Sequence, residues 1–193
     1  TQISWYDNIP ILSYLFIQGK CRKCKKQISI QYLIVELLSI LSFVAAYFFC
    51  GITITTLLFI ILALTFIIIF FIDLKHYIIP NGLTFPLMFI GFVKSFDPNL
   101  NELFPNYINS LIGGFFGYSI IWLIIFFYKT LRKKEGMGLG DAKLIAVVGF
   151  WFGWFSIPFT IFISSMVALI FSIPSLIKKT RDMSTQIPFG PFI

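Results

Sequence analysis

Two aspartates are the residues of this sequence best suited to chemistry, because each lies at the end of an apolar stretch. Asp73 closes the uncharged run 52–72, and Asp141 follows the glycine-rich stretch 136–140. A carboxylate beside lipid costs roughly 2.5–3.5 kcal/mol on insertion scales, so such a residue normally serves a function. Two adjacent carboxyl groups share one proton, and together they activate water and polarise a carbonyl group. The pair predicts an aspartyl protease acting on membrane-borne substrates.

The glycines beside Asp141 favour the same chemistry. Gly138 and Gly140 carry no side chain, so a substrate backbone can approach closely and the loop can bend. We expect both to support catalysis. Each aspartate also has a structural alternative. Asp141 precedes an expected helix and would suit its N-cap, and Lys75 would neutralise Asp73 near a helix C-terminus, where the dipole disfavours a negative charge.

The composition identifies the elements that must position these acids. Hydrophobic residues make up 58% of the chain and charged residues 12%, against about half and a quarter in soluble domains. The uncharged run 52–72 is long enough to cross a hydrocarbon core of about 30 Å as a helix. We therefore predict an all-α, polytopic membrane protein with a cytoplasmic segment over 1–30 and a membrane domain over 31–193. Six spans are expected, at residues 32–49, 52–72, 83–96, 107–128, 142–155 and 157–177.

Charge placement indicates which side of the membrane each loop faces. The net charge of +7 comes from basic residues in short loops, so orientation explains it and no nucleic-acid partner is expected. A cytoplasmic N-terminal segment puts three further loops on its side, residues 73–81, 129–141 and 178–187. Counted with the edge residue Lys143, these regions hold every Lys and Arg except Lys94. Asp73 and Asp141 are therefore expected on the cytoplasmic face.

Three segments, in their order along the chain, carry a resemblance to a known family. They are WYDNIPILSY with GKCRKC at 5–14 and 19–24, IDLKHYIIPN at 72–81, and GLGDAKL at 138–144. The chain resembles the bacterial type IV prepilin peptidases, which belong to the GxGD class of membrane aspartyl proteases, over nearly its whole length. By this resemblance Asp73 and Asp141 are the catalytic pair.

The resemblance implies a function and a location. Such enzymes cut short basic leaders from prepilins and from pilin-like secretion or competence proteins, at the cytoplasmic face of the bacterial inner membrane. Proteolysis needs no cofactor, whereas methylation of the new N-terminus, found in many members, uses S-adenosylmethionine. Glu36 either faces a methyl-donor pocket or is a snorkelling interfacial acid. Leu33 stands where the family usually has proline, within the segment linked to methylation.

The family often carries two Cys-x-x-Cys pairs, which together would complete a tetrahedral zinc site. Only Cys21 and Cys24 are present here, and two thiolates alone are a poor zinc site. Zinc is therefore not expected unless an upstream pair completes the site. We expect the sequence to be a fragment that lacks that pair, the span before it and most of a final span.

Two alternatives remain open from the residues alone. A transporter could use the two acids to bind a cation or relay protons, in which case flux rather than peptide cleavage would depend on them. The chain could also be an inactive scaffold for pilus or secretion assembly that retains the motifs.

Overall fold

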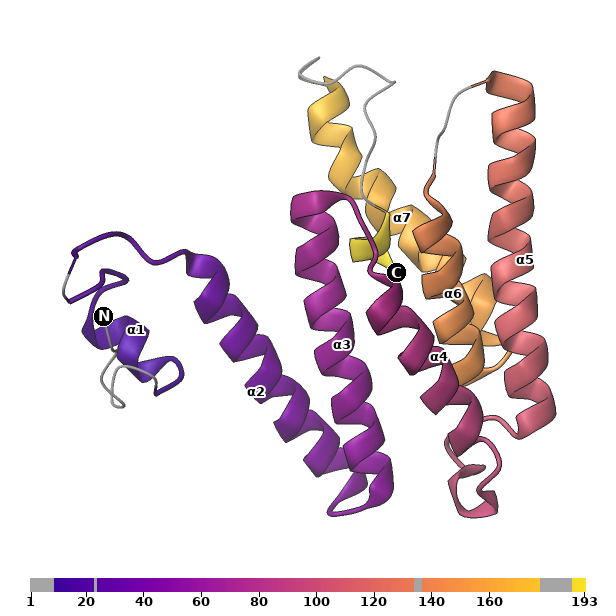
Figure 1. Cartoon of the computed structure of the whole chain (residues 1–193), viewed down its shortest axis with the longest axis horizontal. Coiled ribbons are helices and arrows are strands. Elements are labelled where there is room, and N and C mark those ends of the chain that lie inside the picture. Colours follow the sequence, from indigo (N-terminus) through magenta and orange to yellow (C-terminus); the bar gives the residue numbers. More distant parts are fainter. Residues whose placement is uncertain (1–8, 23, 134–136, 178–188) are drawn as a thin grey trace. The chain divides into compact units, whose positions relative to one another are not determined.

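The computed structural model describes residues 9–22, 24–133, 137–177 and 189–193 (Figure 1). The described residues form helices and turns without a β-strand, apart from one isolated antiparallel bridge between Lys20 and Gln27. The predicted all-α class is confirmed. The chain divides into two compact units, residues 1–67 and 68–193, and each is considered by itself.

The first unit holds a short helix, a tight hairpin, one complete long apolar helix and most of a second. Its elements are α1 (Leu12–Phe16), α2 (Ile30–Cys50) and most of α3 (Ile54–His76). The hydroxyl of Ser29 accepts the N–H of Gln31 at 3.3 Å and so caps the start of α2. Gly51 ends that helix with a φ of 65°, a conformation that glycine adopts without steric cost.

The second unit is built around one buried helix. Its elements are the end of α3, then α4 (Asn81–Lys94), η2 (Pro98–Leu100), α5 (Tyr107–Arg132), α6 (Leu139–Phe152), α7 (Ser156–Ile177) and η3 (Gly190–Phe192). Helix α6 packs against α4, α5, α7 and η3, and Figure 1 shows it between α4 and α5. Most α6 side chains are buried, which fixes the helix that carries Asp141.

Glycines bring α5 and α6 into backbone contact. A Cβ at Gly113 would lie 2.5 Å from the carbonyl oxygen of Gly149, and one at Gly117 would lie 3.0 Å from that of Ile145. The Ser110 hydroxyl adds a hydrogen bond to the Phe150 carbonyl at 2.7 Å. Small residues at this spacing are typical of helices that pack closely in lipid.

A tryptophan and a buried lysine join α4 to α6. The Trp151 indole N–H donates to the Leu87 carbonyl at 2.8 Å, in the space left by Gly91. Lys94 donates to the Trp151 carbonyl at 3.0 Å, and its ammonium lies 3.5 Å from the centroid of the Phe104 ring. A cation near the last carbonyls of α6 complements the dipole of that helix. These contacts hold α6 at the end opposite Asp141.

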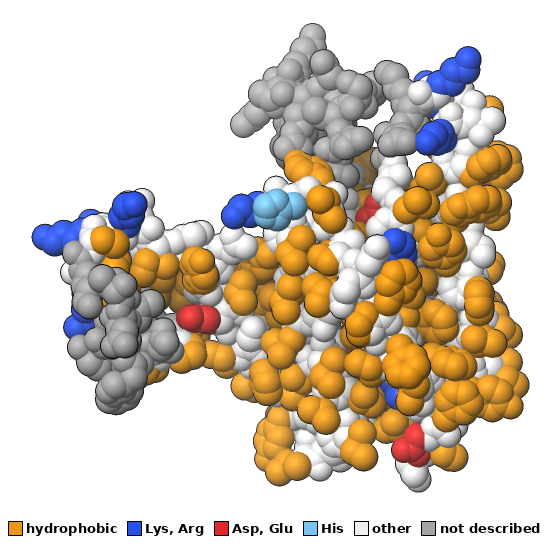
Figure 2. Space-filling view, in the orientation of Figure 1, with side chains coloured by type: hydrophobic (Ala, Val, Ile, Leu, Met, Phe, Trp, Pro, Cys, Tyr) orange, Lys and Arg blue, Asp and Glu red, His pale blue; other side chains and the backbone are white. Residues whose placement is uncertain are grey.

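Each of the six predicted spans corresponds to one helix, with boundaries that differ by a few residues. Among the residues that the structure describes, three helices are long and apolar enough to cross a membrane, namely α2, α3 and α5. Helices α4 and α6 have 14 residues each, which gives a length of about 21 Å. A six-span count therefore stays a prediction. Apolar side chains cover most of the face shown in Figure 2, as expected of a surface in contact with lipid.

Candidate active site

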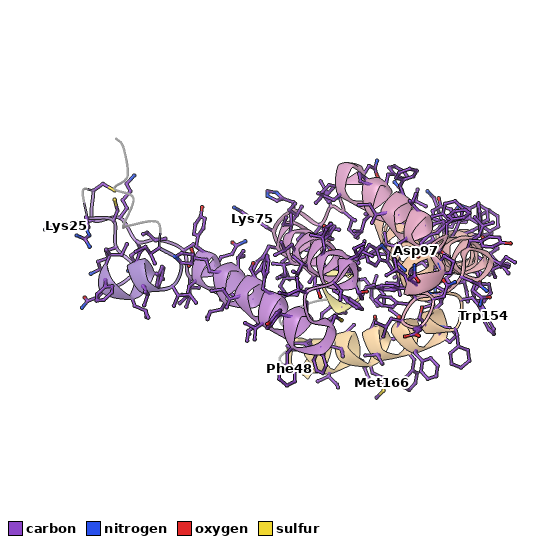
Figure 3. All side chains as sticks on the ribbon, turned by 90° about the horizontal axis from the view of Figure 1, so that it is seen from below. Lys25, Phe48, Lys75, Asp97, Trp154 and Met166 are labelled. Carbon is purple, nitrogen blue, oxygen red and sulfur yellow. The ribbon has the colours of Figure 1, made fainter. Side chains whose placement is uncertain are left out.

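Asp73 lies one turn before the end of α3 and is almost fully buried. Its side chain is 4% exposed, and among the described residues its Oδ2 atom accepts no hydrogen bond of good geometry, although the backbone of Gly190 lies beside the carboxyl group. Lys75 is exposed on the outside of α3 (Figure 3) and makes no ion pair with Asp73 in the described part of the chain. The structural alternative of a neutralising Lys75 is therefore not seen. A buried carboxylate oxygen without a partner marks a site where another polar group is expected to bind.

Asp141 lies inside the first turn of α6, ahead of the predicted span 142–155. Helix α6 begins at Leu139 and Gly138 occupies the N-cap, so Asp141 does not take the N-cap position of the structural alternative. Instead, its carboxyl accepts the backbone N–H of Gly138 at 3.2 Å, as an acid in the first turn does in a capping box. The side chain is 7% exposed. The carboxylate lies where the helix dipole favours negative charge.

The two carboxyl groups influence each other electrostatically. The pKa of Asp141 is raised from its ordinary value of 3.8 to about 6: burial raises it most, the Gly138 N–H lowers it, and the negative charge of Asp73 contributes a smaller rise. An effect of one charge on the other requires that the groups lie close together. The second unit therefore brings together two acids that are 68 positions apart in the sequence.

Ile79 links the surroundings of both acids. Its side chain packs against Gly140, where a Cβ would lie 2.9 Å from the Ile79 Cβ, and against Gly190, where a Cβ would lie 3.1 Å from Cδ1. Gly190 in turn lies against the Asp73 carboxyl, since a Cβ there would be 2.5 Å from Oδ2. One site is thus formed by four segments. They are the C-terminal end of α3, the N-terminal end of α6, the turn η3, and residues 77–80, which connect α3 to α4 and are called the connector below.

The two glycines predicted to support catalysis are not equivalent. A Cβ at Gly140 would require Ile79 to move, whereas one at Gly138 would come no closer than 3.7 Å to the Asp141 carboxyl. A close approach is seen at Gly140, where the neighbour is Ile79, and the approach of a substrate to either glycine stays a prediction. At Gly138 the visible contribution is the backbone N–H that bonds Asp141.

The sequence alone assigned no role to four residues that contribute to this site: Ile79, Gly190, Asn81 and Lys143. The Lys143 ammonium donates to the Asn81 side-chain oxygen at 2.6 Å, which joins the two aspartate motifs directly. Gly190 stands between prolines in PFGP, a pattern typical of a turn. Nothing in the local pattern marks Ile79, because its contacts come from two separate elements, α6 and η3.

Glu36, predicted either for a methyl-donor pocket or as an interfacial acid, lies in the first unit. Its half-buried carboxylate accepts the backbone N–H of Ile11 at 2.8 Å, at the residue that precedes α1. This hydrogen bond ties α1 to α2. A role in methyl-donor binding stays a prediction.

Cys21 and Cys24 lie in the hairpin between α1 and α2. The Cys21 carbonyl accepts the Lys25 N–H and the Cys21 N–H donates to the Lys26 carbonyl, each at 2.9 Å. No group of three or more His, Cys, Asp or Glu side chains able to hold a metal occurs among the described residues. Zinc prefers four protein ligands in a structural site, so the two thiols do not by themselves fit the ion.

The fold and the site together define a class of protein: a helical membrane protein in which two buried aspartates meet at helix ends. Comparison with known sequences gives the family. Residues 60–173 match the model of the type IV leader peptidase family, and residues 1–50 match that of the bacterial peptidase A24 N-terminal domain. The chain belongs to the type IV leader peptidase family, which confirms the resemblance found in its motifs.

Three curated relatives, each named prepilin leader peptidase/N-methyltransferase, illustrate the similarity. The protein of Aeromonas salmonicida (strain A449) is 37% identical over 199 residues, covering 99% of this chain and 64% of its own length. That of Xanthomonas campestris pv. campestris is 39% identical over 192 residues, covering 100% and 66%. That of Pseudomonas aeruginosa is 36% identical over 194 residues, covering 100% and 65%. The chain thus spans slightly less than two thirds of the length of these relatives. No solved structure is significantly similar to it.

Proposed function

We propose that this protein is an intramembrane aspartyl endopeptidase that removes basic leader peptides from type IV prepilins and pilin-like secretion or competence proteins. The observation that carries the proposal is the convergence of two buried carboxyl groups, one with an unpartnered oxygen. Membership of the type IV leader peptidase family supports it, as do the relatives' names. Neither the family nor the names of the relatives support a transporter that uses the same two acids.

The chemistry follows from a proton shared between Asp73 and Asp141. The ionised carboxylate takes a proton from water as the water oxygen bonds to the scissile carbonyl carbon. The protonated carboxyl gives its proton to the carbonyl oxygen, which yields a neutral tetrahedral diol. When this collapses, the C–N bond breaks, the protonated carboxyl gives its proton to the leaving nitrogen, and the ionised carboxylate takes a proton from a diol hydroxyl, which restores the pair. The dyad titrates as a unit, so neither residue is assigned one protonation state.

The proposed site faces the cytoplasm from the inner membrane. The supporting observation is the excess of Lys and Arg in the loops that share a side with both aspartates. A prepilin leader is basic and the body that follows it is apolar, so its cleavage point would lie at the same interface. Cleavage of prepilin only when its leader faces the cytoplasmic side of oriented vesicles would test this placement.

A second proposed activity is methylation of the new N-terminal amine, which the relatives' names also state. S-adenosylmethionine would supply the methyl group. In this chain Glu36 is the candidate for contact with that donor, and its carboxylate already accepts the Ile11 N–H. Transfer of labelled methyl to cleaved pilin by the wild-type chain but not by Glu36→Gln, with cleavage intact in both, would support the assignment.

The first experiment measures cleavage of a prepilin in membranes, with the mature subunit and the leader identified by mass spectrometry. Asp73→Asn should abolish cleavage, because asparagine cannot exchange the proton. Asp97→Asn is the matched control, since Asp97 caps η2 through the Asn99 N–H and asparagine also caps well. Absence of cleavage by the wild-type chain would favour the scaffold alternative, and cleavage by Asp73→Asn would exclude the proposed dyad.

A further inference from the structure

The connector 77–80 runs from one aspartate motif toward the other and is fastened at its start. The Tyr77 N–H donates to the backbone carbonyl of Asp73 at 2.9 Å, so the connector begins on the turn that carries the first acid. Tyr77 has a φ of 57°, a left-handed conformation that costs a residue with a side chain about 1–2 kcal/mol. Such a conformation persists where surrounding contacts enforce it.

The middle of the connector packs between the two acids' neighbours. Ile79 contacts Gly140, which precedes Asp141, and also Gly190, which lies against the Asp73 carboxyl. A side chain at position 140 would displace Ile79, and one at position 190 would displace the Asp73 carboxyl or Ile79. The position of Ile79 is therefore coupled to the separation of the catalytic pair.

The far end of the connector is fastened to α6. Asn81 is the first residue of α4, and its side-chain oxygen accepts the Lys143 ammonium at 2.6 Å. The same ammonium lies 5.5 Å from the centroid of the exposed Phe85 ring, within reach of a cation–π contact. A hydrogen bond to a charged donor is among the stronger ones in proteins.

In the described residues, Lys143 is not placed to neutralise either aspartate. It is two positions from Asp141, and residues at that spacing on a helix do not face each other. No ion pair between Lys143 and either catalytic aspartate occurs in the described part of the chain. Its ammonium is directed instead to the neutral amide of Asn81.

We infer that Asn81 and Lys143 are positioning residues, whose hydrogen bond holds the connector and Ile79 in place and thereby sets the spacing of Asp73 and Asp141. The inference rests on the proposed peptidase function. The hydrogen bond between Lys143 and Asn81, called the bridge below, is not proposed to contact substrate. Loss of the bridge should misplace the two carboxyl groups without removing them.

The test is a double-mutant cycle in the full chain, measured as kcat and KM for prepilin cleavage. Asn81→Leu removes the acceptor without changing charge, and Lys143→Met removes the donor. Each should lower kcat about ten- to a hundredfold and leave KM nearly unchanged, because a misplacement of 1 Å can cost about a hundredfold. The double variant should lose no more than either single variant. Asn81→Asp and Lys143→Arg, which keep an acceptor and a donor, should retain most activity.

Asn106→Leu is the matched control for general destabilisation, since Asn106 caps α5 through the Asn109 N–H and lies outside the site. It should lower thermal stability without the selective loss in kcat. Wild-type kcat in Asn81→Leu, or a double variant whose loss is the product of the single losses, would overturn the bridge.

Hydrogen exchange keeps the inference testable apart from activity. The amides of Tyr77, Ile78 and Ile79 should exchange faster in Asn81→Leu than in the wild-type chain and in Asn106→Leu. Unchanged exchange would overturn the bridge whether or not the chain cleaves prepilin. Faster exchange in a chain that does not cleave would support the bridge and count against the proposed function alone.

Discussion

Gly190→Ala offers a direct test of the arrangement around Asp73. A Cβ at this position would lie 2.5 Å from Oδ2 and 3.1 Å from the carboxyl carbon of Asp73. To reach the 3.4 Å of ordinary contact, the carboxylate oxygen or the turn must move by about 0.9 Å. Gly190 does not have a left-handed φ, so alanine adds a steric change without backbone strain.

The size of the effect follows from that displacement. A misplacement of about 1 Å at a catalytic group can lower the rate about a hundredfold, equivalent to about 2.7 kcal/mol of barrier. We therefore expect kcat for prepilin cleavage to fall about a hundredfold with little change in KM. The assay is steady-state cleavage in membranes with purified prepilin at several concentrations.

Gly82→Ala is the matched control for this substitution. A Cβ at Gly82 would meet nothing within 4 Å, and the residue lies in the first turn of α4, where alanine favours the helix. This variant should keep wild-type kcat and equal or higher thermal stability. If Gly190→Ala cleaves as fast as Gly82→Ala, the turn η3 does not press on Asp73 and the geometry of the site is wrong.

Three further predictions concern the same unit. Gly140→Ala should lower kcat far more than Gly138→Ala, because a Cβ at 140 would lie 2.9 Å from Ile79 whereas one at 138 has an ordinary contact at 3.7 Å; equal losses would contradict this. The raised pKa of Asp141 means that the folded chain holds this proton more tightly than the unfolded chain between pH 3.8 and about 6. The unfolding temperature should therefore fall as pH rises through that window, and Asp141→Asn should flatten the slope. Gly149→Ala should lower stability by about 1–3 kcal/mol through overpacking against α5, measured by thermal unfolding with Gly82→Ala as control.

Helix order was predictable because lipid makes strong demands on sequence. Charged loops and breakers such as Pro80 bounded each apolar stretch, and every expected span overlaps one helix. The start of α6 lies at Leu139 rather than at 142. Its first turn contains Gly140 and Asp141, so hydropathy did not mark it as helix. For the same reason the N-cap alternative placed Asp141 ahead of the helix and not in its first turn.

The acidic pair was predictable, but the arrangement around it was not. Two carboxyl groups at the ends of apolar runs are rare enough to be recognised in one sequence. The position of Ile79 depends on its packing against Gly140 in α6 and Gly190 in η3, which no local sequence pattern encodes. The bridge from Lys143 to Asn81 spans 62 positions. Sequence reasoning also weighted Gly138 and Gly140 alike, whereas their surroundings differ.

The central claim is that Asp73 and Asp141 act as one proton-sharing pair. The most direct test compares single-turnover cleavage of prepilin by Asp73→Asn, Asp141→Asn and the double variant with that by the wild-type chain. The account predicts that each single substitution removes as much activity as both together, because half a dyad cannot perform the reaction. Partial losses that multiply in the double variant would contradict it, since they would mean that the two carboxyl groups act independently.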